Sequence, residues 1–546
     1  MVFSPTPRRS LIFPIFVLII PTVLLLHSIY RPQSSLISFV RSSKSPNRSN
    51  NTDFADHGLL PAINRLRALC EEENLFESEY GRANLRMSRA YEGSHYRLRL
   101  LLDKTLRGEP ITVSAIGGSI TAGHHVSEDE GWFYKFGEWL DDFVGQDVDV
   151  VRVNGAAPAS GSDYFSFCFP LHIPANSDLV LVELAVNDEG ILEHVENMEN
   201  LLRGLLDMPN HPAVILVEAV AFSNGGMGGG GGRMHLPVAQ YFDVPVVNQR
   251  HPLANHFARY PQLVQSYFVP NYWGDPDTRH VNARGHRDLA MLIASFIRDV
   301  ACEMLADQTF HVPELSNNLR LDGVSAPTAL EASLSEQTDL KDAQLAIEQA
   351  LWPTQARSWR QIAAEDEVLG TLMPGMWMTP LEYGLLPRLS VLGGWNTDPA
   401  FSVPPLRPVC LSTRSKDPRY NLTPSANTGW EAWVHPEYLD KPYLVGRVVG
   451  ARVSFEMETN FGVVKTYSLR SKTFGLGTVE CWTDEERTRA VQVVGWWDNG
   501  EANIGRFSTI REGLLPGLHT ITCEISNQTS DPGNGHEFRI ISMMSL

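Results

Sequence analysis

The sequence predicts an α/β fold in which a three-layer α/β/α domain with a parallel sheet precedes a C-terminal antiparallel, β-sandwich-like domain. In the first part, short and almost wholly apolar runs alternate with helical stretches, as expected for strands buried on both faces. After about residue 400 the apolar runs are short and separated by Gly, Asp and Asn, which is typical of sandwiches and jelly rolls. The length of 546 residues accommodates two folded domains and tethers.

Five apolar runs predict the strands of the parallel sheet, at residues 111–116, 148–153, 179–184, 214–220 and 244–247. Apolar residues spaced by threes and fours predict helices, chiefly at residues 59–102, 132–143, 197–206 and 285–304. We therefore expect an α/β domain with an N-terminal helical extension at 59–305, a mixed linker at 306–400 and the β-domain at 401–546.

The first thirty residues differ from the rest of the chain. An uncharged apolar run extends from Leu11 to Leu26 and approaches the roughly 20 residues that a membrane helix needs. This run predicts a membrane anchor in residues 1–30, with a cleaved signal peptide as the alternative. Residues 31–58 are rich in Ser and Asn and predict a flexible stem.

Four glycosylation sequons begin at Asn47, Asn50, Asn421 and Asn527. Two of these sequons lie in the predicted stem and two in the C-terminal domain. Their placement indicates that the protein is a glycoprotein. Together with the anchor they predict a single-pass membrane protein of the secretory pathway, in the Golgi above all, with a luminal or extracellular body.

Composition excludes some functions. The formal net charge is -18, so the chain lacks the basic surface that nucleic-acid binding needs, and no nucleic-acid partner is expected. The six cysteines include no CxxC pair, which argues against zinc or dithiol redox chemistry. Disulfides are expected if the protein folds in an oxidising compartment. The pair Cys481–Cys523 is favoured because both residues lie in the same β-rich region.

Small or polar residues follow three of the predicted strands. The first strand ends in Gly117-Gly118-Ser119, the second in Asn154-Gly155 and the third in Asn187-Asp188. Each alone reads as an ordinary turn or helix cap. Ligands of open parallel sheets bind beyond the carboxyl ends of the strands, so the joint appearance of these groups predicts one functional crevice.

The segment before the closing helix supplies Asp277 and His280. A serine hydroxyl needs a base to accept its proton, so Ser119 is the expected nucleophile, His280 its base and Asp277 the group that orients the imidazole. The backbone N–H groups of Ser119 and Gly155 and the side-chain amide of Asn187 are the expected oxyanion-hole donors. No metal or organic cofactor is implied.

These residues together resemble the SGNH hydrolases, or GDSL-type esterases, over residues 109–305. The family has a Ser after the first strand, a Gly after the second, an Asn in a GxND segment and a DxxH before the last helix. Ser119, Gly155, Asn187 and the pair Asp277/His280 match these landmarks, and the HxNxxGH-like ending selects His280 over His286 as base. The resemblance implies a flavodoxin-like α/β/α fold.

Two positions depart from the family pattern. Gly118 replaces the Asp that precedes the nucleophile, which puts the bracing of that turn in doubt, and Ala185 replaces the Gly of GxND. The GGS variant resembles large fungal capsule-associated members. The resemblance implies an ester hydrolase or O-acyltransferase that acts on acylated glycans, or another ester substrate, through an acyl-Ser119 intermediate. The alternative is a non-catalytic glycan-binding protein that retains the fold.

Three further groups of residues are interpreted more plainly. His124 and His125 are expected to contact solvent or substrate rather than a metal, and Glu183 to be a buried, partnered carboxylate. The tryptophans of the C-terminal domain are expected mainly in its core. That domain is expected to fold separately and to supply no catalytic group.

Overall fold

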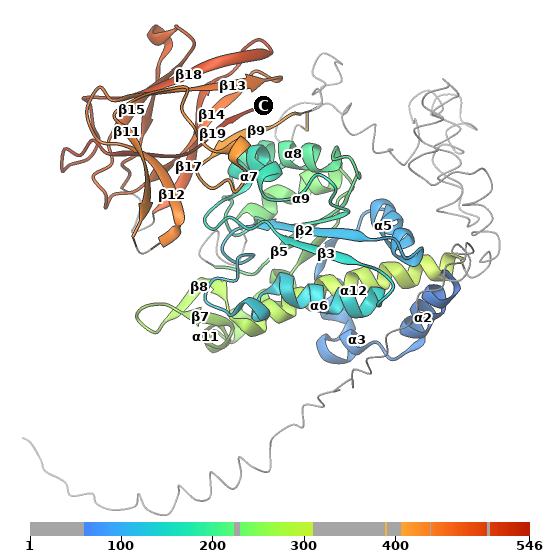
Figure 1. The fold of residues 1–546 in the computed structure, drawn as a ribbon. Coiled ribbons are helices and arrows are strands. Elements are labelled where there is room, and N and C mark those ends of the chain that lie inside the picture. The colour runs from blue at the N-terminus through green and yellow to red at the C-terminus, as the bar shows by residue number, and fades with distance from the viewer. Residues whose placement is uncertain (1–58, 223–229, 309–387, 390–405, 437, 499–502) are drawn as a thin grey trace, which may run out of the picture. The chain divides into compact units, whose positions relative to one another are not determined.

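The computed structural model describes residues 59–222, 230–308, 388–389, 406–436, 438–498 and 503–546 (Figure 1). The predicted anchor at 1–30, the whole of the predicted stem at 31–58 and nearly all of the predicted linker at 306–400 lie outside these residues. The helices are α2 Leu59–Glu71, α3 Leu75–Tyr80, α4 Arg82–Met87, α5 Tyr96–Leu106, α6 Trp132–Val144, α7 Ser162–Cys168, α8 Leu192–Leu206, α9 Gly231–Tyr241, α10 Arg250–Arg259, α11 Gln262–Tyr267 and α12 Ala283–Gln308.

The first domain contains a six-stranded sheet of order β1-β6-β5-β4-β2-β3 and a separate hairpin, β7–β8. Its strands are β1 Arg89–Tyr91, β2 Ile111–Gly117, β3 Val150–Asn154, β4 Leu179–Glu183, β5 Ala213–Glu218, β6 Val246–Asn248, β7 Phe268–Pro270 and β8 Pro276–Val281. Strands β2 to β6 are parallel in flavodoxin-like order, and β1 pairs antiparallel with β6. The predicted three-layer α/β/α fold is confirmed.

Strand alternation divides the core between the two faces of the sheet. Odd-numbered residues of β2, β4 and β5 pack with α2, α5, α6 and α12, whereas even-numbered ones pack with α7, α8 and α9. Figure 1 shows these two groups of helices on opposite sides of the sheet. Burial on both faces explains why β4 and β5 are apolar almost throughout.

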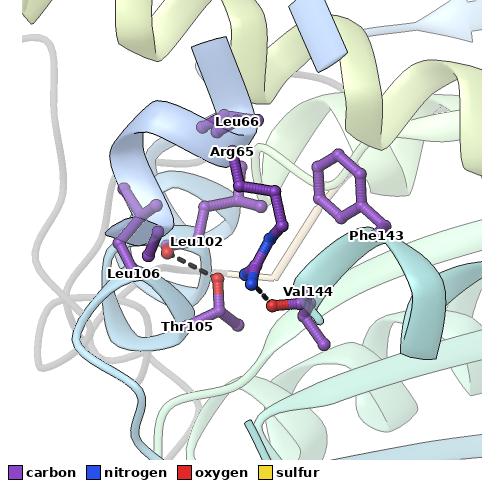
Figure 2. Close-up of a pocket in the computed structure, with 8 residues that line it drawn as sticks. Arg65, Leu66, Leu102, Thr105, Leu106, Phe143 and Val144 are labelled. Atoms are coloured by element: carbon purple, nitrogen blue, oxygen red, sulfur yellow. Dashed lines mark hydrogen bonds between the residues drawn. The ribbon is translucent and has the colours of Figure 1, made fainter. Parts of the chain in front are cut away.

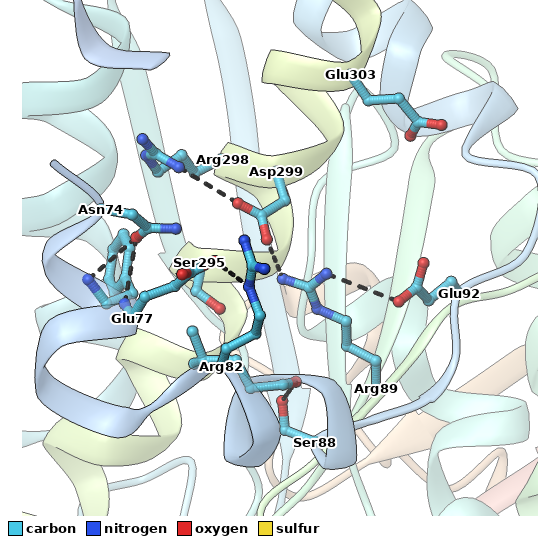
Figure 3. A network of polar contacts seen from close by, with 12 residues as sticks. Asn74, Glu77, Arg82, Ser88, Arg89, Glu92, Ser295, Arg298, Asp299 and Glu303 are labelled. Carbon is cyan, nitrogen blue, oxygen red and sulfur yellow. Dashed lines mark hydrogen bonds and ion pairs between the residues drawn. The ribbon is translucent and has the colours of Figure 1, made fainter. Parts of the chain in front are cut away.

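The N-terminal extension is fastened to α12. Cys70 of α2 forms a disulfide with Cys302 of α12. Arg89 in β1 pairs with Asp299 of α12 and with Glu92, and Figure 3 shows Asp299 lying between Arg89 and Arg298. The prediction that residues 59–102 are helical is therefore wrong at β1, where pairing with the edge of the sheet outweighs the helical pattern of the flanking segments.

A small hollow lies between α2, α5 and α6 (Figure 2). Its wall is largely apolar, and the Arg65 guanidinium crosses it to donate to the Val144 carbonyl. The helix ends that form it lead into β2 and β3, so it lies at the amino ends of the strands, away from the crevice predicted at their carboxyl ends.

The C-terminal domain is a sandwich of two antiparallel sheets, as predicted. One sheet has the order β10-β13-β18-β15-β16, and the other has the order β11-β12-β19-β14-β17 with β9 beside β19. The strands are β9 Val409–Ser412, β10 Ala426–Thr428, β11 Trp430–His435, β12 Tyr438–Gly446, β13 Arg452–Thr459, β14 Val464–Arg470, β15 Thr478–Thr483, β16 Val491–Val494, β17 Ile504–Arg511, β18 Gly517–Ile525 and β19 Phe538–Ser545. Residues of both sheets, including Trp430, form its own core.

The two domains also share a buried cluster. The expectation that the β-domain folds separately stays a prediction. Tyr467 and Met544 of the β-domain lie in one buried cluster with Phe165 of α7. A disulfide joins Cys168, also of α7, to Cys410 of β9. The β-sandwich therefore covers apolar surface that the first domain would otherwise expose.

All six cysteines are paired, which is the pattern of proteins that fold in oxidising compartments. The predicted pair Cys481–Cys523 is confirmed, and the two residues face each other across β15 and β18. Of the four sequon asparagines, Asn421 and Asn527 are exposed, and the other two lie outside the described residues.

No helix in the described ranges is both long enough and apolar enough to cross a bilayer. Helix α12 has 26 residues, but Arg287, Asp288 and Arg298 are among the charged side chains that make it amphipathic. This finding contradicts the prediction of a single-pass membrane protein. The run in residues 1–30 that motivated it lies outside the described residues.

Candidate active site

Ser119 lies in a tight loop that directly follows β2. The loop is closed by backbone hydrogen bonds from Ala122 to Gly118 (3.1 Å) and from His124 to Ser119 (3.0 Å). Ser119 is partly exposed, while Gly118 before it and Ile120 after it are buried. The loop therefore presents the Ser119 hydroxyl to the surface and buries the backbone on either side.

Two polar side chains from neighbouring strands brace this loop at Thr121. The Thr121 hydroxyl donates to Glu183 of β4 at 3.0 Å, and the Asn154 amide at the end of β3 donates to the Thr121 carbonyl at 3.0 Å. Glu183 is fully buried, and its carboxyl group has Thr121 as a partner, as the sequence predicted. These two contacts hold the turn that carries Ser119, in which Gly118 takes the place of the Asp that is usual in SGNH hydrolases.

Gly118 brings the Asn187 side chain against the nucleophile loop. A Cβ at position 118 would lie 2.1 Å from Asn187 Oδ1 and 2.8 Å from its Cγ, both far inside van der Waals contact. Glycine is therefore required for this packing. The close approach places a side-chain amide beside the residue that precedes Ser119.

Asp188 fixes the segment that carries Asn187. It is fully buried, and its carboxylate contacts His194 of α8 at 3.1 Å and His235 of α9 at 2.7 Å, and accepts from the Ser162 backbone at 2.8 Å. Burial alone would raise the pKa of Asp188, but the hydrogen bonds with the two histidines hold it well below its usual range. The carboxylate thus ties three helices to the end of β4.

Asp277 and His280 both lie on β8, in the hairpin that precedes α12. His280 Nδ1 lies 2.6 Å from Asp277 Oδ2, and Nε2 lies 2.7 Å from Ser119 Oγ. If Nδ1–H donates to Asp277, Nε2 is left to accept the Ser119 proton. The structure therefore brings together Ser119, His280 and Asp277 from segments 161 residues apart.

The charge of Asp277 is well defined. Burial would raise its pKa, but the hydrogen bonds from His280 and from the Arg279 backbone N–H (2.9 Å) lower the pKa to about 2. Asp277 is therefore a carboxylate at any working pH. A fixed negative charge beside Nδ1 stabilises the imidazolium that forms when His280 accepts a proton.

The other nearby histidines are placed differently. His286 is buried, and its Nδ1 accepts from the Trp132 backbone N–H at 3.2 Å, so it caps α6 instead of facing Ser119. The exposed residues His124 and His125 lie close to His280, with ring centroids 4.8 and 6.0 Å from that of His280. Within the described ranges, no group of three or more His, Cys, Asp or Glu side chains is arranged to hold a metal ion.

Gly155 does not offer the predicted oxyanion-hole donor. Its N–H donates to the Ala115 carbonyl at 2.8 Å, because the chain after β3 continues to pair with β2. Its missing side chain has a packing role, since a Cβ would lie 2.6 Å from the His172 carbonyl oxygen. The same loop approaches the Asn187-Asp188 segment at Gly161, six residues after Gly155. A Cβ on Gly161 would lie 2.2 Å from Asp188 Oδ1.

The buried Glu183 carboxyl makes stability depend on pH. Burial raises its pKa from 4.5 to about 8, although hydrogen bonds from Thr121 oppose this. Because the folded-state pKa is raised, its stabilising contribution is complete below about pH 4.5 and is lost as the pH rises through about 8. The difference corresponds to about 5 kcal/mol.

Glu183→Gln imitates the neutral acid and is expected to remove most of this dependence. As the pH is raised from 5 through 7 to 9, the thermal unfolding midpoint should fall less for this variant than for the unmodified protein. Glu72→Gln, at an exposed position, is the matched control, and its unfolding midpoint should change with pH as that of the unmodified protein does. An equal loss of stability in Glu183→Gln and the unmodified protein would show that Glu183 is not the group responsible.

Sequence reasoning missed Asn154, Thr121 and Asp188 as supports of the site. Asn154 and Asp188 belong to the motifs that follow the predicted strands, and Thr121 belongs to none of these motifs. Their partners are distant in sequence: Asp188 contacts His235, 47 residues further along the chain. Only their position at the carboxyl ends of predicted strands could have suggested a role.

No family model and no curated protein matches this sequence. Among solved structures, it is similar to a two-domain esterase active on acetylated mannans, with a TM-score of 0.55, 16% identity, and 84% of this chain and 98% of that chain covered. The same esterase co-crystallised with mannopentaose matches with a TM-score of 0.54 and 16% identity, and the match covers 84% of this chain and 97% of that chain. A lipase/acylhydrolase from Enterococcus faecalis matches 35% of this chain and 96% of its own at 17% identity, with a TM-score of 0.26.

The similarity to the two-domain esterase extends over both domains of this chain. The narrower resemblance to fungal capsule-associated members is tested by none of these comparisons and stays a prediction. The residues predicted at the carboxyl ends of β2 and β4 lie beside the hairpin that carries Asp277 and His280. This chain therefore has the fold of the SGNH hydrolase superfamily, followed by a C-terminal β-sandwich domain.

Proposed function

We propose that this protein is a serine esterase that removes acyl groups from acylated glycans. The observation that carries the proposal is the hydrogen-bonded series Ser119–His280–Asp277, with both distances at 2.7 Å or less. The similar two-domain esterase acts on acetylated mannans, which supports an acetylated glycan as the substrate class. The fold alone would be compatible with many activities.

In the proposed reaction, Ser119 Oγ attacks the acyl carbon while its proton passes to His280 Nε2. The backbone N–H of Ser119 and the amide of Asn187 stabilise the oxyanion. Collapse of the intermediate breaks the ester bond, and the His280 proton goes to the departing sugar oxygen, leaving acyl-Ser119. His280 then takes a proton from the water that attacks the acyl group. The second intermediate collapses with cleavage of the bond to Ser119 Oγ, which regains the proton from His280 as the carboxylic acid leaves.

Transfer of the acyl group to a sugar hydroxyl would use the same residues, with that hydroxyl in place of water. The experiment is a time course of the full chain with acetylated mannan, followed by proton NMR in the presence of an unacetylated oligosaccharide. Free acetate is the expected product, and acetylated acceptor would mean an acyltransferase. If neither product forms, the protein is better described as the alternative, a non-catalytic glycan-binding protein.

A further inference from the structure

The hairpin that carries Asp277 and His280 also carries two exposed aromatic rings at its tip. Tyr272 is 92% exposed and Trp273 is 81% exposed. Among the large hydrophobic side chains of the described residues, these two are the most exposed. Large aromatic side chains are usually mostly buried, so two adjacent ones in solvent mark a binding surface.

The tip is well ordered by its own hydrogen bonds. Asn271 Oδ1 accepts from the backbone N–H groups of Trp273 (2.9 Å) and Asp275 (3.1 Å), and the Asn271 N–H donates to the Asp275 carbonyl (2.7 Å). The two aromatic rings meet edge to face, with centroids 5.0 Å apart. A rigid turn loses little entropy when a ligand binds, so the exposed rings are preorganised.

The base of the hairpin is anchored in the protein. Phe268 of β7 and Val281 of β8 lie in a buried apolar cluster with Tyr267 and Phe257. The Phe222 backbone donates to the Thr278 carbonyl at 2.8 Å. Because this base is fixed, the tip stands at a constant distance from His280. Trp273 lies seven positions before His280, which is at most about 23 Å along an extended strand.

We infer that Tyr272 and Trp273 form a subsite for sugar rings of a polymeric glycan whose acylated unit lies at Ser119. The inference rests on the proposed function and extends it to the class of substrate. A pyranose has an apolar C–H face, which packs on an aromatic ring, and a hydroxyl rim that stays in water. A small ester has no sugar ring to place on Tyr272 or Trp273, so this subsite would favour glycan substrates over small esters.

The kinetic test compares Trp273→Ala and the double variant Tyr272→Ala/Trp273→Ala on acetylated mannan and on p-nitrophenyl acetate. We expect the ratio of kcat/KM for the polymer to kcat/KM for the small ester to fall about tenfold, chiefly through KM. Trp273→Phe, which keeps an aromatic face, should recover most of this loss. Tyr134→Ala, which removes a half-exposed ring on α6, is the matched control and should leave the ratio unchanged.

An unchanged ratio in the double variant would overturn the inference. So would an equal fall for both substrates, because the tip would then support the site without binding the polymer. Binding of deacetylated mannan to Ser119→Ala, measured by isothermal titration, is independent of turnover and separates this inference from the proposed function. Loss of that binding in Ser119→Ala/Trp273→Ala supports the subsite, whereas binding to phosphatidylcholine vesicles in place of mannan would identify a lipid surface and refute it.

Discussion

Replacing Ser119 by alanine is expected to lower ester cleavage by at least a thousandfold, and by as much as about a millionfold. The hydroxyl is the only group at this position that can form the acyl-enzyme bond, and His280 Nε2 lies 2.7 Å from it. What remains is the contribution of the oxyanion hole and substrate binding. The measurement is kcat/KM on p-nitrophenyl acetate.

The fold should survive this substitution. Ser119 is partly exposed, and alanine removes one hydroxyl without adding volume. The thermal unfolding midpoint and circular dichroism spectrum are therefore expected to match those of the unmodified protein, which makes the activity loss interpretable. A folded Ser119→Ala protein that keeps more than about a thousandth of the rate would contradict the role of Ser119.

Gly118→Asp, which restores the residue usual in the family, is expected to lower kcat by about a hundredfold or more. The new Cβ would lie 2.1 Å from Asn187 Oδ1, so either the amide turns away or the nucleophile loop shifts. In the first case the oxyanion loses a donor. A substitution toward the family consensus would thus be harmful here, because the space that the Asp side chain needs is occupied by Asn187.

A double-mutant cycle tests this explanation. Gly118→Ala introduces the same Cβ without charge and should also lower kcat, and Asn187→Ala should lower it by a similar factor. If the two act through one contact, the double variant Gly118→Ala/Asn187→Ala will be no slower than Asn187→Ala alone. Full activity in Gly118→Ala, or simple multiplication of the two losses, would mean that the close approach is unimportant.

Local pattern was enough to predict the regular parts of the fold. Strand β2 was expected at residues 111–116 and extends over Ile111–Gly117, and the closing helix was expected at 285–304 and extends over Ala283–Gln308. Most residues of both elements are buried, so their apolar side chains form a pattern that can be recognised in the sequence.

Contacts between distant segments explain most of what the sequence did not reveal. Gly155 matched a family landmark, but its N–H is used by the continued pairing with β2, which no local pattern indicates. Asp277 and His280 are three residues apart and lie on one strand of an irregular hairpin, which their spacing alone does not indicate. The exposure of Tyr272 and Trp273 likewise depends on which segments pack around the hairpin.

Labelling with a fluorophosphonate probe, followed by peptide mass spectrometry, tests most directly whether Ser119 is a nucleophile activated by His280. In the unmodified full chain we expect one adduct, on the peptide that contains Ser119. His280→Ala should slow its formation by at least a hundredfold, because the base that accepts the hydroxyl proton is removed. Ser119→Ala should give no adduct. An active esterase that remains unlabelled at Ser119, or that is labelled at another serine, would contradict the assignment.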